Sequence, residues 1–427
     1  MDTMNETTRI KRQFYHSLKR GTGEAYLIAK KYQEIDFSSY LIKGVLNNFA
    51  YDGQTESSRA KYIFDIIAIS KNQGKIRNAV LDGLKNEQCD TWNLTHIFDL
   101  AKLYFEQGDL EFREAIYNRF LNNPIEGSDW AGSEEILDMD GLDGLIYIAE
   151  KFGEVIDQDP DYWHDDCIIQ SFQKEHPNIA VIKELEDKAK TNKFIRLYLD
   201  CTKRSKFSWK RKRAKQIDIE DIVEELLDPN KGLSFYQKRN LSESELYSVG
   251  KRLLIEKDES NIGKLLDIFT EHKFPFDGDF ILTFAKRKSN PSNGIKEYAI
   301  EALKFLKSDS IRNFALERIR KSRNPATFTD ILMSNYESGD FQLLSDIANK
   351  FNDEHIIEGL ANSYSDIYNS NNTKECKEPL EVLYSKMNCG IHRNEIVKIL
   401  IKNNVLSKKI REEIKFDSYL ETRELIE

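Results

Sequence analysis

Hydrophobic residues recur at intervals of three and four along most of the chain, in short stretches separated by polar residues. This spacing places the hydrophobic side chains of a stretch on one face of an α-helix, whereas a half-buried strand would alternate at every second residue. The stretches that show it well are 23–35, 38–49, 58–70, 93–107, 341–352 and 355–369. Most of them are joined by a few polar residues, which is typical of antiparallel helix hairpins. The pattern therefore predicts an all-α protein.

One hydrophobic frame recurs in five segments. In each, a first core position is followed directly by an arginine or lysine, and further core positions come four and eight residues after the first. The core positions are Ile76, Val80 and Leu84; Phe112, Ile116 and Phe120; Ile295, Ala299 and Leu303; Ile311, Ala315 and Ile319; and His392, Ile396 and Leu400. A recurring frame of this kind predicts an α-solenoid of stacked antiparallel helix pairs, as in HEAT-like repeats.

The basic residue of each frame is expected to lie beside the core face, about 100° round the helix from it. These residues are Arg77, Arg113, Lys296, Arg312 and Arg393. Such a side chain can rest its hydrophobic stem on the edge of the core and keep its charged head in water. Any single amphipathic helix would show the same arrangement, so the prediction of repeats depends on the recurrence.

Several longer segments carry a resemblance to known proteins: 21–27 (GTGEAYL), 47–67, 134–153 and 389–426. On these segments the chain resembles a bacterial family of HEAT-like repeat proteins, which implies a helical-repeat fold over nearly its full length. Members of that family tend to end in a Cys-x-x-Cys-Arg element, whereas this chain has His392 at the second cysteine position. Since most members have no assigned activity, the resemblance implies a fold and no particular reaction.

The charge pattern changes abruptly near the middle of the chain. Residues 203–215 contain eight basic residues and no acid, and residues 218–228 contain six acids. We therefore expect two helical arms, 1–200 and 230–427, joined by a charged segment, 201–229. The candidate binding residues of the basic patch are Lys203, Arg204, Lys206, Phe207, Trp209, Lys210, Arg211, Lys212, Arg213 and Lys215. The patch is a solvated loop, a clamp for nucleic-acid phosphates with aromatic rings that stack on bases, or a site for an acidic protein.

An acid-rich stretch, 134–166, contains twelve acids and a single lysine. Its candidate binding residues form the acidic patch, which consists of Glu134, Glu135, Asp138, Asp140 and Asp143. Such a surface speeds the encounter with basic partners and repels nucleic acid, although acid-rich surfaces often serve only to keep a protein in solution. An immunity or defence component that neutralises a basic effector would use a surface of this kind.

Residue types that bind metals gather in the segment 159–177, which contains His164, Cys167 and His176. The prolines near its two ends predict one helix over 160–176. On that helix His176 lies about 120° from His164, so the three side chains cannot share one ion. We therefore expect a solvated or packed helix and no metal site.

No other stretch matches a catalytic or cofactor motif. Residues 138–144 resemble a calcium loop but fail its requirement for oxygen ligands, so we expect a turn that leads into a helix. The glycines at 21–26 lack the last glycine of a dinucleotide-binding loop. The chain also has no Walker loop, nucleophile elbow, His-Glu-x-x-His or Cys-x-x-Cys motif. The sequence thus predicts no catalytic, cofactor-binding or metal-ligating residue, and a protein that is not an enzyme.

Composition sets the remaining expectations. The net charge of −9 argues against a protein covered with phosphate-binding surface, and five scattered cysteines do not indicate a disulfide framework. The N-terminus lacks the hydrophobic core of a signal peptide, and no uncharged stretch reaches the roughly 18 residues of a membrane span. We expect a cytoplasmic, non-enzymatic scaffold that binds a protein, with no cofactor and no membrane partner. The alternatives are nucleic-acid backbone binding through 203–215 and the defence role through 134–166.

Overall fold

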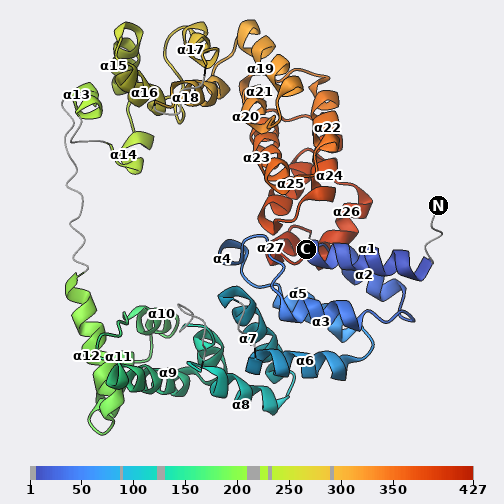
Figure 1. Ribbon diagram of the computed structural model, residues 1–427, viewed down its shortest axis with the longest axis vertical. Helices are drawn as coiled ribbons and strands as arrows, with labels where there is room; N and C mark the ends of the chain where they lie inside the picture. Colours follow the sequence, from blue (N-terminus) through green and yellow to red (C-terminus); the bar gives the residue numbers. More distant parts are fainter. Residues whose placement is uncertain are drawn as a thin grey trace. The chain divides into compact units, whose positions relative to one another are not determined.

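The computed structural model describes residues 6–86, 90–122, 130–208, 222–228, 233–288 and 293–426 (Figure 1). Within these ranges the chain forms twenty-seven α-helices and three short 3-10 helices, and no β-strand. The prediction of an all-α protein is therefore confirmed.

The chain divides into two compact units. Unit 1 comprises Met1–Lys215 together with Phe416–Ser418, and unit 2 comprises Gln216–Lys415 and Tyr419–Glu427. The helices that begin in unit 1 are α1 (Glu6–Arg20), α2 (Glu24–Lys31), α3 (Ser38–Leu46), α4 (Gly53–Glu56), α5 (Ala60–Ala68), α6 (Gln73–Asn86), α7 (Thr91–Glu106), α8 (Leu110–Arg119), α9 (Ser133–Gln158), α10 (Cys167–Glu175), α11 (Val181–Ala189) and α12 (Lys193–Ser208).

Unit 2 continues the helical pattern. Its helices are α13 (Ile222–Leu227), α14 (Phe235–Arg239), α15 (Glu243–Ile255), α16 (Glu259–Ile268), α17 (Gly278–Ala285), α18 (Ile295–Ala302), η1 (Leu303–Phe305), α19 (Asp309–Lys321), α20 (Ala326–Thr329), α21 (Leu332–Asn335), α22 (Asp340–Lys350), α23 (Glu354–Ser370), η2 (Lys374–Cys376), α24 (Lys377–Lys386), α25 (Gly390–Lys402), α26 (Lys408–Glu413), η3 (Ile414–Phe416) and α27 (Leu420–Glu424). Helices that are neighbours or next neighbours in the chain make most of the contacts within each unit, for example α7 with α8 and α22 with α24.

The recurring hydrophobic frame supplies part of both cores. In the four frames carried by α6, α8, α18 and α19, every core position is at most 3% exposed. These positions are Ile76, Val80, Leu84, Phe112, Ile116, Phe120, Ile295, Ala299, Leu303, Ile311, Ala315 and Ile319. The four-residue spacing thus identifies the buried face of these helices.

In the fifth frame, on α25, the first two positions have the opposite burial to that expected. His392 is partly exposed, and its Nε2 lies 3.0 Å from Asn362 Oδ1. Arg393, expected at the flank, is completely buried and donates from Nη1 to Asn388 O at 2.7 Å. Because backbone carbonyls satisfy its guanidinium, the arginine can take the inner position, and the prediction for His392 was wrong.

The prediction of one helix over 160–176 was also wrong in its first half, because α10 begins only at Cys167. Ahead of it, Asp159 accepts from Asp161 N at 3.1 Å, and Asp165 accepts from Cys167 N at 2.9 Å. Aspartate side chains that bond to nearby backbone N–H groups compete with helix formation. The turn expected in 138–144 is a kink within α9, where Gly141 has φ 54° and ψ −123°.

A short segment from the C-terminal part of the chain belongs to unit 1. The ring of Phe416 stacks on Tyr26 with centroids 4.0 Å apart, and Ser418 N donates to Gly21 O at 2.8 Å. Gly21 has φ 72°, and a Cβ atom at this position would lie 2.2 Å from Ser418 Oγ. Only glycine therefore fits here, for conformational and for steric reasons.

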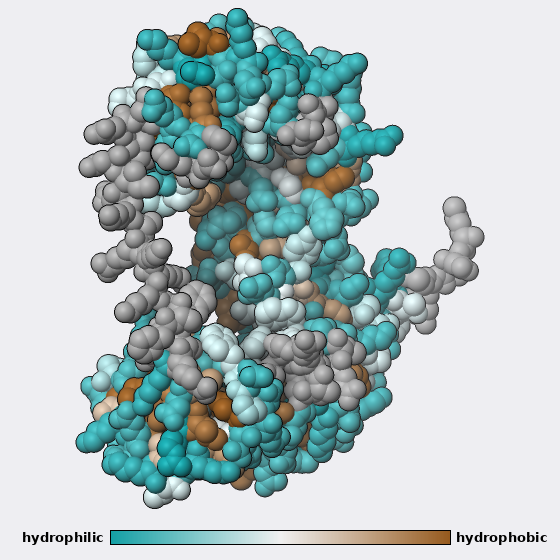
Figure 2. Space-filling view, turned by 60° about the vertical axis from the view of Figure 1, so that its left-hand side comes forward, coloured by the Kyte–Doolittle hydropathy of each residue, from teal (hydrophilic) through white to brown (hydrophobic). Residues whose placement is uncertain are grey.

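The face of the molecule drawn in Figure 2 is largely hydrophilic, with separate hydrophobic areas between the charged side chains. No helix in the described ranges is both long enough and hydrophobic enough to cross a membrane.

Candidate functional sites

Two acidic side chains of unit 1 form a pair. Asp99 on α7 and Glu135 in the first turn of α9 share a side-chain hydrogen bond; Asp99 is partly exposed, and Glu135 is only 4% exposed. Burial raises the pKa of Asp99, and burial together with the charge of Asp99 raises the pKa of Glu135 well above its usual range. The Asp99–Glu135 pair therefore keeps a proton to a higher pH than free carboxyl groups do, and the protonated carboxyl group donates to the other.

Polar neighbours surround this pair. Lys102, one turn after Asp99, forms an ion pair with Asp138, with Nζ and Oδ2 2.5 Å apart. The lysine favours ionisation of Asp99, whereas Asp138 opposes it. The cluster thus contains three carboxyl groups and one amine, an arrangement that can hold and release a proton.

His96 lies beside the cluster but cannot act as its base. Its ring is completely buried, and Nε2 lies 2.9 Å from Gly44 O. Burial lowers the pKa of His96 to about 4, so the ring is neutral and Nε2–H donates to the carbonyl. Nδ1 then accepts from Ser58 Oγ at 3.2 Å. Because no part of the ring reaches solvent, the Ser58–His96 contact is structural.

The acidic patch predicted from the sequence occupies three different environments. Glu134 and Asp143 are exposed, whereas Glu135 is buried in the pair with Asp99. Asp138 and Asp140 form ion pairs, the first with Lys102 and the second with the guanidinium of Arg113, with Nη2 and Oδ2 3.0 Å apart. Glu134 and Asp143 are the members of the patch that face solvent without a described ion pair.

Of the basic patch, the structure places one candidate. Lys203 Nζ lies 3.8 Å from Glu186 Oε1, and both side chains are more than half exposed. The side chains of the other candidates lie outside the described residues: Arg204, Lys206, Phe207, Trp209, Lys210, Arg211, Lys212, Arg213 and Lys215.

Three of the five basic frame residues, all arginines, bind acids from other parts of their unit. Arg77 donates to Asp109, which follows it by 32 residues, and Arg113 donates to Asp140, which follows it by 27. Arg312 donates to Asp340, which follows it by 28. In each case the acid lies outside the helix that carries the arginine. The basic frame position therefore connects different helices.

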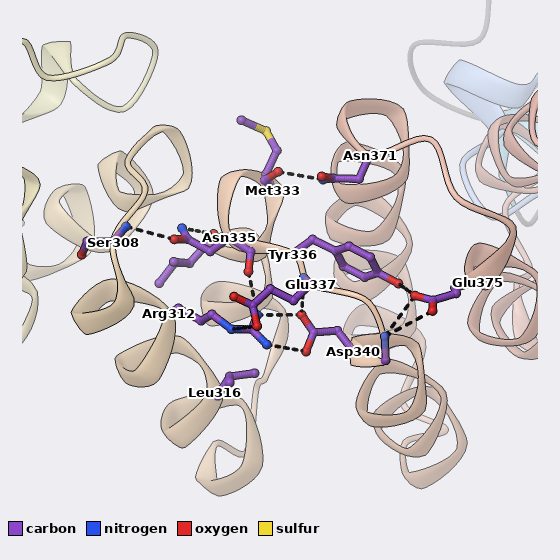
Figure 3. Close-up of polar contacts among 12 residues, drawn as sticks. Ser308, Arg312, Leu316, Met333, Asn335, Tyr336, Glu337, Asp340, Asn371 and Glu375 are labelled. Carbon is purple, nitrogen blue, oxygen red and sulfur yellow. Dashed lines mark hydrogen bonds and ion pairs between the residues drawn. The ribbon is translucent and has the colours of Figure 1, made fainter.

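The arginine of the link in unit 2, which Figure 3 shows, is the most deeply buried of the three. Arg312 Nη1 and Nη2 donate to the two carboxylate oxygens of Asp340 at 2.7 and 2.8 Å, and Nη1 also donates to Asn335 O at 2.6 Å. The side chains of Arg312 and Asp340 are only 15% and 9% exposed. Beside them Glu375 accepts from Tyr336 Oη at 2.7 Å (Figure 3).

Unit 2 also has an acid with a raised pKa, which is partly exposed. Burial raises the pKa of Asp330, next to α20, to about 6. Ser363 lies nearby and donates from Oγ to Gly359 O at 3.0 Å. Burial also raises the pKa of Asp366 on α23, although the charge of Lys304 opposes this shift. Asp366 affects Asp330 through its charge, and no hydrogen bond joins these two acids among the described contacts.

The metal-binding residue types of segment 159–177 lie apart from one another. The ring of His164 packs on Phe152 with centroids 3.9 Å apart, and Cys167 is exposed and donates from Sγ to Asp165 Oδ2 at 3.0 Å. In the described part of the chain, no group of three or more His, Cys, Asp and Glu residues is arranged to hold a metal ion.

The sequence did not identify Asp99, Glu135 as a buried residue, or Asp330. A signal existed for Asp99, which stands in the sequence between the buried residues Phe98 and Leu100 of α7. Glu135 resembled an ordinary acid of a helix N-terminus, where exposed glutamates are common. Asp330 follows a very short helix, whose period the sequence does not define.

No family model, no curated protein and no solved structure matches this chain. The function must therefore be argued from the residues of the chain itself.

Proposed function

We propose that the chain is a HEAT-like repeat scaffold, an α-solenoid of stacked antiparallel helix pairs, that binds a protein partner. The observation that carries this proposal is the recurrence of one connection. Arg77, Arg113 and Arg312 each bind an acid that lies outside their own helix, over separations of 32, 27 and 28 residues. A connection that recurs in both units supports a chain built from similar units, each of which contacts its neighbours.

Repeat proteins of this kind offer extended surfaces, whose usual use is to hold another macromolecule. The part of the surface that best defines a partner is the exposed portion of the acidic patch, Glu134 and Asp143. Both carboxylates are accessible and have no described ion pair, so they are available to a basic protein surface. We therefore propose a partner that presents lysine or arginine side chains to the start of α9.

The buried acids do not favour an enzyme over a scaffold. Glu135 is 4% exposed and His96 is completely buried, so neither can touch a substrate directly. Their polar contacts are made with other side chains and the backbone of unit 1. They support a structural role in joining α7 to α9.

The proposal is tested by purifying the tagged chain from its native host, with and without nuclease treatment, and identifying bound proteins by mass spectrometry. We expect a protein that survives nuclease and is lost with the double variant Glu134→Lys and Asp143→Lys. The matched control is Glu34→Lys with Glu106→Lys, which makes the same charge change at exposed acids of unit 1.

A bound protein that both double variants retain equally would contradict the role of the acidic patch. Complete loss of bound material on nuclease treatment would contradict a protein partner altogether. That result would favour binding to nucleic acid, as proposed for the basic patch.

A further inference from the structure

Helix α15 of unit 2 is hydrophobic on two faces. Its inner face buries Val249 and Leu253. Its outer face carries Tyr247, Leu254 and Ile255, which are 53%, 39% and 71% exposed. A surface helix normally places polar residues on its outer face, so large exposed apolar side chains in one short helix indicate a contact surface.

A cavity opens beside Tyr247. It has a volume of about 620 Å³ and is lined by Glu243, Leu246 and Tyr247 of α15 and by Lys273, Phe274, Pro275 and Phe276 of the loop after α16. The rings of Tyr247 and Phe276 lie 5.0 Å apart between centroids. The hydrophobic part of this lining suits an aliphatic side chain from a partner.

Two opposite charges flank Tyr247 on the same outer stripe. Glu243 lies one turn before it and Lys251 one turn after it, and both are exposed. Eight residues of helix separate these charges by about 12 Å, so they cannot pair within one helix. Neither has an ion-pair partner among the described residues.

We propose that α15 is a self-association surface, on which a second copy of the chain docks with its own α15 antiparallel. With the two-fold axis close to Tyr247, each Glu243 faces the partner subunit's Lys251. The dimer therefore contains two such ion pairs, one on each side of the axis. Leu254 and Ile255 lie seven and eight residues beyond Tyr247, about 10–12 Å along the helix. They therefore reach the end of the partner's helix at which the cavity opens.

The distribution of features along α15 favours a second copy over another partner. A two-fold interface uses the same patch on both subunits, so the patch must contain each feature together with its complement. The outer face of α15 has a negative and a positive charge at equal distances from Tyr247. It also has apolar side chains toward one end and a cavity toward the other. An unrelated basic or acidic partner would require charge of a single sign.

The test is the mass of the full chain in solution, measured by sedimentation equilibrium over a wide range of concentration. The wild type is expected to approach twice the 49.8 kDa of one chain. Glu243→Lys alone and Lys251→Glu alone place like charges opposite each other twice per dimer. Each should weaken association about tenfold. The double variant, Glu243→Lys with Lys251→Glu, restores opposite charges and should associate like the wild type.

Glu6→Lys is the matched control, because it changes the charge of another exposed glutamate in the first turn of a helix. It should leave the dimer unchanged. Ile255→Ser removes the most exposed apolar side chain without touching a charge and should also weaken association. A wild type that remains monomeric throughout overturns the proposal, and so does a double variant that associates as weakly as the single variants.

Discussion

The two units bury charged side chains in different ways. In unit 1 the partly exposed acid Asp99 is bonded to a second acid, Glu135, and the connecting arginine, Arg77, is 26% exposed. In unit 2 the partly exposed acid Asp330 lies near the hydroxyl of Ser363, and the connecting arginine, Arg312, is 15% exposed. Acids and arginines therefore occur near both cores, but the connecting arginine is more deeply buried in unit 2 than in unit 1. An acid next to another acid must share its proton, whereas an acid next to a hydroxyl can lose it.

This difference determines how each unit responds to pH. All these acids have a folded-state pKa above the unfolded value, so the folded state binds more protons than the unfolded state. Their contribution to stability is complete below the unfolded pKa and is lost as the pH rises through the folded pKa. Both units are therefore expected to weaken toward alkaline pH, and unit 2 should do so around the pKa of Asp330, which is about 6.

The largest expected effect comes from the deeper arginine link. Arg312→Ala leaves Asp340, which is 9% exposed, without its bidentate partner. We expect the free energy of unfolding to fall by about 3 kcal/mol, because a buried carboxylate without its cation is costly. Urea unfolding followed by circular dichroism measures this loss.

Arg77→Ala is the matched change in unit 1. Asp109 and Glu111, its two partners, are 28% and 56% exposed, so water can replace the guanidinium. The expected loss is about 1 kcal/mol. Equal losses for the two variants would mean that depth of burial does not distinguish the two links.

The second effect concerns the acid of unit 2. Asp330→Asn keeps the shape of the side chain and removes its ionisation. Between pH 5 and pH 8 the wild type should lose about 1.4 kcal/mol more stability than the variant, because Asp330 must ionise in a partly buried site. Urea unfolding at both pH values measures the difference. If the variant follows the same pH dependence as the wild type, Asp330 is not the group that titrates.

The smallest effect is expected for the acid pair of unit 1. Glu135→Gln replaces one carboxyl group by a neutral amide that can still bond to Asp99. We expect the variant to lose less stability than the wild type as the pH rises from 5 to 8, because it lacks a carboxyl group whose pKa is raised in the folded state. The effect is smaller than for Asp330→Asn because the pair can release one proton and keep its hydrogen bond. A larger effect than that of Asp330→Asn would reverse the comparison between the units.

Much of the helical structure could be predicted from spacing alone. Hydrophobic residues four apart mark the buried face where the backbone N–H and C=O groups are bonded within the helix. Ile76, Val80 and Leu84 of α6 are an example, since all three are fully buried. The prediction failed where a polar side chain found a backbone partner, because spacing contains no information about hydrogen bonds. Arg393 entered the core in this way, and the aspartates before Cys167 kept that segment out of a helix.

The buried acids could not be predicted in the same way. The environment of Glu135 depends on Asp99, which lies on a different helix and 36 residues earlier in the chain. Nor could the acidic patch be resolved into exposed and paired members, since Asp138 and Asp140 meet their cations, Lys102 and Arg113, only after α7, α8 and α9 have packed. Contacts of this kind depend on how the helices pack together, and this packing cannot be derived from a single sequence.

The contact of Ser418 with Gly21 has a consequence for synthesis of the chain. Unit 1 needs Phe416–Ser418 to complete its first helices, yet the ribosome makes these residues about 200 positions after the rest of the unit. At bacterial and eukaryotic elongation rates the delay is on the order of ten to forty seconds. During that time the ring of Tyr26 has no Phe416 to cover it, and the nascent chain presents that apolar surface to chaperones.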